Sequence, residues 1–258
     1  VLKNASGIQE QIKTATDAAA KEALLNELAG RVITPYIIIA VVLLLLAVMI
    51  KGSSLPEIES ADEHAAETHS VEKTSLFQFP HLLLGVLCLF LYVGVEVMAG
   101  DAIGTYGKEL GMPLDQTKYF TTFTLCAMLF GYVIGVFTIP KYVSQQKALA
   151  ISAILGIIFT GCVFFTTGYT AITFIALLGL ANALMWPAIF PLAIDGLGKF
   201  TKTGAALLIM GIAGGALIPL LYTTLKDKHI VSNHVSFLIC MLPAYLYIFY
   251  YAVKGFAV

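Results

Sequence analysis

Seven long apolar stretches dominate this sequence and restrict the folds that it can adopt. They lie at about residues 32–50, 80–104, 119–139, 147–166, 170–194, 204–222 and 235–254. Each stretch is long enough to cross the hydrocarbon core of a bilayer as a helix, at ~1.5 Å per residue. Strands of a membrane barrel would be shorter and would alternate in polarity. We therefore predict an all-α integral membrane protein, a bundle of seven transmembrane helices.

The composition agrees with a protein that is solvated by lipid. Of the 258 residues, 59% are apolar and 12% are charged, whereas a soluble domain is roughly half apolar and about a quarter charged. The net charge of −1 offers no basic surface for nucleic acid. Neither a disulfide framework nor a zinc site is expected, because the cysteines stand singly in apolar stretches, at Cys88, Cys126, Cys162 and Cys240.

The polar segments divide the chain into parts. Residues 1–31 are polar, and residues 51–79 form an acidic linker that we expect to be solvated. His64 and His69 of this linker lack metal-like partners, so we assign them no site. A short amphipathic helix is predicted in residues 1–31 from apolar residues at helical spacing, namely Ile8, Ile12, Ala15, Ala19 and Leu28.

Lysines between the stretches favour one orientation. With the 51–79 linker on the cytoplasmic side, seven lysines face the cytoplasm and four face the opposite side, leaving residues 1–31 aside. Since cytoplasmic segments carry the excess of Lys and Arg, we predict that the linker and Lys254 are both cytoplasmic.

Glycines and prolines predict how the helices pack and bend. Pairs of glycines four residues apart, at Gly100/Gly104, Gly131/Gly135 and Gly211/Gly215, predict close helix approach. Prolines within or near the ends of the stretches predict kinks, at Pro187, Pro191, Pro219 and Pro243.

Glu96 lies deep in the second stretch, with no Lys or Arg in any other stretch to neutralise it. A carboxylate at that depth is costly unless it is protonated, paired or hydrated, so it is a candidate proton or cation site. Gly94 and Gly100 are expected to leave room beside it for a ligand. The alternative is an acid held by neighbouring helices for packing alone. Asp101 stands roughly 140° further round the helix, where it could cap the helix or line the outer mouth.

Asn182 and Trp186 are four residues apart and would share a helix face. An amide beside an indole suits a sugar, because the amide bonds hydroxyls and the ring stacks on the C–H face. An interhelical hydrogen bond with an interfacial aromatic is the alternative. No Walker A, H-E-x-x-H or G-x-S-x-G motif is present, so we expect neither an enzyme nor an ATP motor, and no cofactor.

Several motifs resemble one transporter family. They are Thr34-Pro35-Tyr36-Ile37-Ile38, Tyr92-Val93-Gly94-Val95-Glu96-Val97, Trp186-Pro187-Ala188-Ile189-Phe190-Pro191, and Lys202-Thr203-Gly204-Ala205 through Met210 with Gly214-Gly215-Ala216-Leu217-Ile218-Pro219. In this order and spacing they resemble helices six, seven, ten and eleven of the fucose–galactose–glucose:cation symporter family, within the major facilitator superfamily.

The resemblance implies a fold and an activity. It implies helices six to twelve of a twelve-helix fold: the 32–50 stretch, then the cytoplasmic linker, then a six-helix carboxyl-terminal half at 80–254. Helices one to five would belong to a missing amino-terminal half of the same transporter. The implied activity is symport of a sugar with a proton or sodium across a bacterial inner membrane, and the implied sugar site includes Tyr92, Glu96 and Met210.

Two departures from the family pattern bear on a cytoplasmic gating charge and on the substrate, in that order. Gly131-Tyr132-Val133-Ile134-Gly135 stands where the family has a G-R-x-x-G pattern. Asp101-Ala102 stands where the family commonly has a serine and an aromatic residue. Glu96 resembles the glucose- and galactose-type members, which favours a hexose over fucose. A non-transporting sugar sensor on the same fold is the second hypothesis.

Overall fold

The structure is a computed structural model, and it describes residue 11 and residues 18–52, 75–228 and 230–257. These residues form helices and connecting segments, with no strand in the described part of the chain. They divide into two compact units, Val1–Ala61 with Pro113–Lys118, and Asp62–Met112 with Tyr119–Val258. Each unit is described by itself.

The described part of the first unit contains one long helix, α2 (Ala18–Lys51), and the single turn α5 (Leu114–Thr117). No break separates polar from apolar residues at position 31, where the sequence predicted a boundary. The apolar section of α2, Ile33–Met49, has 17 residues, or about 26 Å of helix, near the lower limit for a membrane span. Its membrane crossing stays a prediction. Ile8, Ile12, Ala15 and linker residues 53–74 lie outside the described residues.

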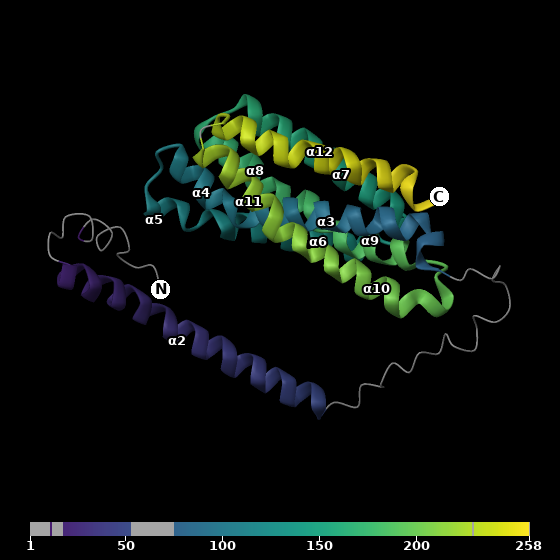
Figure 1. The fold of residues 1–258 in the computed structure, drawn as a ribbon, viewed down its shortest axis with the longest axis horizontal. Coiled ribbons are helices and arrows are strands. Elements are labelled where there is room, and N and C mark those ends of the chain that lie inside the picture. Colours follow the sequence, from purple (N-terminus) through teal and green to yellow (C-terminus); the bar gives the residue numbers. More distant parts are fainter. Residues whose placement is uncertain (1–10, 12–17, 53–74, 229, 258) are drawn as a thin grey trace. The chain divides into compact units, whose positions relative to one another are not determined.

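The second unit contains the six other predicted spans, each as a helical stretch long and apolar enough to cross a bilayer (Figure 1). The stretches are α3 (Pro80–Gly100), α6 (Phe120–Thr138), α7 (Gln145–Phe165), α8 (Gly168–Asn182) with α9 (Met185–Ile194), α10 (Thr201–Met210) with η4 (Gly211–Ala213) and α11 (Gly214–Asp227), and α12 (Asn233–Val253). The short helix α4 (Ala102–Glu109) follows α3. The prediction of six spans between residues 80 and 254 is confirmed.

Two of these stretches are interrupted. The first break lies at Ala183 and Leu184, between α8 and α9. Pro187 explains it, because proline has no N–H to bond the carbonyl of Ala183 four residues earlier. The second break is η4, where a turn of 3₁₀-helix precedes Gly214 and Gly215. Three further prolines stay inside helices that continue through them, Pro191 in α9, Pro219 in α11 and Pro243 in α12.

Helix α3 forms the core of this unit, since it contacts α8, α9, α10, α11 and α12. Glycines allow the close contacts. A Cβ on Gly131 would lie 2.6 Å from the Cβ of Ala183, and one on Gly215 would lie 3.0 Å from Val93. Close approach is thus confirmed for these two predicted glycine pairs. The prediction of close helix approach is wrong for Gly100, because no atom lies within 4 Å of the position that its Cβ would occupy.

Candidate functional site

The carboxyl group of Glu96 has a phenol as its nearest partner. Tyr92 precedes it by one helical turn on α3, and the Tyr92 hydroxyl donates a hydrogen bond of 2.7 Å to Glu96 Oε1. Tyr92 is fully buried, whereas Glu96 is partly exposed. The carboxyl is therefore oriented by a neutral donor and remains accessible from one side.

Two further tyrosines from other helices lie within electrostatic range of the Glu96 carboxyl, without a hydrogen bond to it. They are Tyr132 of α6 and Tyr245 of α12. Tyr245 is fully buried, and Tyr132 is 37% exposed. We call Tyr92, Glu96, Tyr132, Asn182 and Tyr245 the Glu96 cluster. Sequence analysis missed Tyr132 and Tyr245 as site residues, although Tyr132 occupies the motif position where the family pattern has a basic residue.

An aromatic surface adjoins this cluster. The ring of Trp186 meets the ring of Tyr92 edge-on, with 6.3 Å between centroids. Trp186 also stacks on Phe190, one turn later in α9, with an angle of 12° between the ring planes. Trp186 and Phe190 are both partly exposed. The structure thus places Tyr92 between Glu96 and Trp186, while their role in sugar binding stays a prediction.

Asn182 is placed differently from the prediction. It is the last residue of α8, and Trp186 belongs to α9, so the two do not lie on one continuous helix. The Asn182 side chain is fully buried, and its Oδ1 accepts a hydrogen bond of 2.8 Å from the Tyr245 hydroxyl. Its Nδ2 is buried without a hydrogen-bond partner.

The remaining predicted residues lie at the margins. Asp101 is exposed at the carboxyl end of α3, and Met210, at the end of α10, is 70% exposed. The sequence also suggested that Gly94 leaves room for a ligand beside Glu96. This is wrong, because the side chain of Ile218 from α11 fills the space against Gly94.

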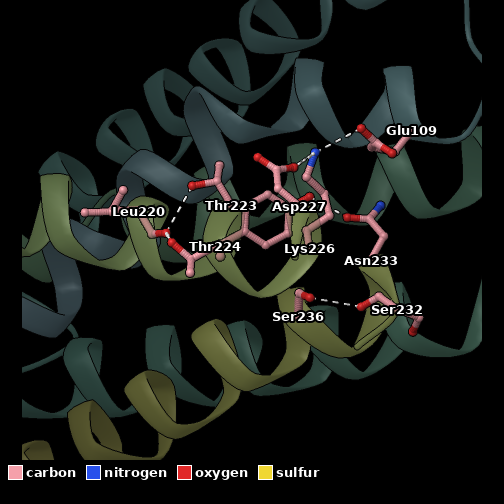
Figure 2. A network of polar contacts seen from close by, with 10 residues as sticks. Glu109, Leu220, Thr223, Thr224, Lys226, Asp227, Ser232, Asn233 and Ser236 are labelled. Atoms are coloured by element: carbon pink, nitrogen blue, oxygen red, sulfur yellow. Dashed lines mark hydrogen bonds and ion pairs between the residues drawn. The ribbon is translucent and has the colours of Figure 1, made fainter. Parts of the chain in front are cut away.

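A second polar network joins α4, α11 and α12 (Figure 2). Lys226 forms ion pairs with Glu109, at 2.9 Å, and with Asp227, at 3.0 Å. The Tyr222 hydroxyl donates to Asn233 Oδ1 at 2.5 Å. The charges shown here are paired with one another, so this network fastens helix ends. The part of the chain that the structure describes holds no group of three His, Cys, Asp or Glu side chains that could bind a metal ion.

Comparison with known proteins gives both a fold and relatives. The structure matches the crystal structure of the major facilitator superfamily transporter FucP in the outward conformation with a TM-score of 0.73 and 24% identity, over 96% of this chain and 60% of that one. From this structural match, the chain has the fold of the carboxyl-terminal part of a major facilitator superfamily transporter. No family profile matches the chain.

Sequence relatives narrow this class. The chain is 31% identical over 241 residues to a glucose/galactose transporter of Brucella abortus, covering 92% of this chain and 57% of the relative. It is 30% identical over 250 residues to a putative glucose/galactose transporter of Helicobacter pylori, covering 95% and 60%. An L-fucose-proton symporter of Escherichia coli is 27% identical over 189 residues, covering 72% and 43%.

These relatives confirm the resemblance recognised in the motifs: over most of its length the chain is similar to proteins named as glucose/galactose transporters and to an L-fucose-proton symporter. It is a multi-pass membrane protein. It spans a little under two thirds of the length of the glucose/galactose transporters that it matches.

Proposed function

We propose that this chain is part of a secondary active transporter that carries a hexose such as glucose or galactose, or fucose, with a cation across a bacterial inner membrane by alternating access. One observation carries the proposal: Glu96 lies within a membrane-length helix and accepts a hydrogen bond from Tyr92, whose ring in turn contacts Trp186. The names of the relatives support it, and they offer no support for the alternative of a non-transporting sugar sensor. The relatives' greater length suggests that the amino-terminal half of the transporter completes the site.

Within the site, the aromatic face and the carboxyl have different roles. Trp186 stacked on Phe190 offers a flat surface to the C–H face of a sugar ring. Tyr92 and Glu96 supply hydrogen-bonding groups beside it. Asp101 and Met210 remain proposed sugar contacts, and both are exposed. Asn182 also remains one, although a sugar would reach it only after a rearrangement, because its side chain is fully buried.

The surroundings of Glu96 favour a proton over sodium as the coupling ion. Sodium, like other hard cations, would require several oxygen ligands around an ionised carboxylate. Among the described residues, the hydrogen bond to Glu96 comes from the phenol of Tyr92, and Tyr132 and Tyr245 place two more neutral phenols within electrostatic range. An Escherichia coli relative is named as a proton symporter.

Counterflow in proteoliposomes tests the proposal. Proteoliposomes that contain the complete transporter are loaded with unlabelled glucose, galactose or fucose, and entry of the same labelled sugar is followed. Accumulation of the sugar is then measured with an imposed proton or sodium gradient. Transport predicts counterflow of at least one sugar, and symport predicts accumulation with one gradient. Specific sugar binding without counterflow would indicate a sensor instead.

The charges at the two ends of the bundle support the predicted orientation. The six stretches alternate in direction, so the beginning of α3 and the end of α12 lie at one end. Among the described residues of this unit, that end carries one acid, Asp195, and five lysines: Lys141, Lys147, Lys199, Lys202 and Lys254. The opposite end carries equal numbers of the two charges, with three lysines and three acids: Lys108, Lys226 and Lys228, and Asp101, Glu109 and Asp227. The positive end is therefore proposed to be cytoplasmic.

Cysteine labelling tests this orientation. In a background with Cys126 and Cys162 replaced by serine, Ala257→Cys should react with an impermeant maleimide only after cells are opened. Thr167→Cys, at the exposed amino-terminal cap of α8, should react in intact cells. The reverse pattern would overturn the orientation.

Removal of the proposed sugar platform should weaken sugar binding. Trp186→Ala is expected to weaken the free energy of sugar binding by about 0.5–1.5 kcal/mol beyond the loss of buried area, because the aromatic ring that would stack on the sugar is lost. In the structure this ring is positioned by Phe190 and Tyr92. Titration calorimetry on the complete transporter measures the change. Trp186→Phe keeps a ring and should retain most of the affinity, while unchanged affinity in a folded Trp186→Ala variant would assign Trp186 to packing.

A further inference from the structure

The fully buried amide of Asn182 has only part of its hydrogen-bonding capacity satisfied. Its Oδ1 is occupied by the Tyr245 hydroxyl, while its Nδ2, with two N–H donors, has no partner. A buried donor without an acceptor is costly. An acceptor that reaches Nδ2 during the functional cycle would remove this cost.

The packing of α3 against α8 and α9 indicates which acceptor lies at the same position as Asn182 along the helix axes. The two stretches run in opposite directions, and two contacts fix their register. At one level the rings of Tyr92 and Trp186 meet. At the other level Thr124 of α6 bridges both stretches: its hydroxyl donates to the carbonyl of Ala99, and its own carbonyl packs against Gly179.

Glu96 and Asn182 lie between these two levels. Glu96 is four residues from Tyr92 and three from Ala99, and Asn182 is four residues from Trp186 and three from Gly179. They therefore stand at the same height on adjacent stretches. Tyr245 links them independently, since it donates to Asn182 and interacts electrostatically with Glu96.

Tyr245 is itself held in one position. Its ring packs directly over Gly156 of α7, where an added Cβ would lie 2.5 Å from two ring carbons. The hydroxyl donates to Oδ1 of Asn182, and in this pairing both N–H donors of Nδ2 are left free. The packed Tyr245 ring thus holds the Asn182 side chain in place through this hydrogen bond.

We propose that Asn182 Nδ2 is the second hydrogen-bond donor to the Glu96 carboxylate in its ionised state, and that Tyr245 is the positioning residue that aims it. Loss of the proton from Glu96 then draws α8 and α12 toward α3, and gain of the proton releases them. This inference rests on the proposed function, in which the charge of Glu96 changes during transport. It adds the residues that sense that change.

The groups facing Glu96 are consistent with this role. The titratable ones that interact with it are Tyr92 on its own helix, Tyr132 of α6 and Tyr245 of α12, all neutral phenols near neutral pH. Of the neighbouring stretches, α8–α9 places Trp186 against Tyr92 and Asn182 against Tyr245, and α11 places Ile218 against Gly94. None of these three side chains titrates in this range. In this set, Glu96 is the group that changes charge.

The pH dependence of sugar affinity in the complete transporter tests the inference. An ionised Glu96 that has lost a donor is less stable, so a higher pH is needed to remove its proton. The midpoint of the affinity profile should move upward by about one pH unit in Asn182→Leu and by roughly half a unit in Tyr245→Phe. Tyr245→Phe keeps the ring over Gly156 and should fold.

Matched controls separate this role from a structural one. Tyr247→Phe and Tyr251→Phe remove hydroxyls on the same helix that donate to the carbonyls of Leu84 and His81. Their pH midpoints should equal that of the wild type. An unshifted midpoint in folded Tyr245→Phe, or an equal shift in the controls, would overturn the inference.

Glu96→Gln distinguishes this failure from failure of the proposed function. A flat pH profile in Glu96→Gln, with no shift in Tyr245→Phe, would reject only the positioning role. A wild-type profile in Glu96→Gln would reject the coupling role of Glu96 and the inference with it.

Discussion

Glu96→Gln is expected to abolish accumulation of sugar against its gradient while exchange of sugar continues. Glutamine keeps the shape of the side chain and its ability to accept a hydrogen bond from Tyr92, but it cannot gain or lose a proton. A transporter with a permanently neutral group at this position could still alternate between its two faces. Gradient-driven accumulation should therefore fall to the equilibrium level, while counterflow should remain within a few-fold of wild type.

Proteoliposomes with an imposed ion gradient measure accumulation, and counterflow measures exchange in the same preparation. Glu109→Gln is the matched control. It removes an acid that is paired with Lys226 at the end of the bundle, and it should leave accumulation intact. If accumulation and counterflow were lost together in Glu96→Gln, Glu96 would bind the sugar directly. Wild-type accumulation would show that the carboxyl serves neither purpose.

The spans were predictable because lipid leaves the backbone few alternatives. An apolar stretch with no water available must satisfy its own backbone groups, so length and hydropathy suffice to predict a helix. The last span, predicted at 235–254, is observed as Asn233–Val253. The stretch predicted at 204–222 was too short, because the observed helical stretch runs from Gly198 to Asp227. Its last turn carries Lys226, whose charge is paired by Glu109 of α4, a contact that hydropathy does not detect.

The site was predictable only where one residue carried the signal. A carboxyl within an apolar stretch identified Glu96, and a single tryptophan beside a proline identified Trp186. The partners that orient them come from distant helices. Tyr245 is one of several tyrosines on α12, and only its packing over Gly156 and its bond to Asn182 distinguish it. At Gly94 the sequence predicted a space that does not exist. The absence of a side chain indicates room beside the helix, but it does not reveal that Ile218 of α11 fills that room.

The tight packing of α11 against α3 gives the largest expected effect on stability. A Cβ on Gly214 would collide with the backbone carbonyl of Phe90. Backbone cannot rotate away as a side chain can, so Gly214→Ala should force α11 away from α3. We expect a loss of about 1–3 kcal/mol, the usual cost of overpacking, seen as a lower unfolding temperature in detergent.

Two other glycines on this pair of helices provide a graded control. At Gly215 an added Cβ would lie 3.0 Å from Cγ1 of Val93 and 3.1 Å from Cγ2 of Val97, which are side-chain atoms that can shift. At Gly100 nothing lies within 4 Å, so alanine there should be neutral or slightly stabilising. The unfolding temperature should therefore fall in the order Gly100→Ala, Gly215→Ala, Gly214→Ala. Equal temperatures for the first and last variants would show that α11 can move from α3 without cost, and that the close contact between their backbones does not hold the bundle together.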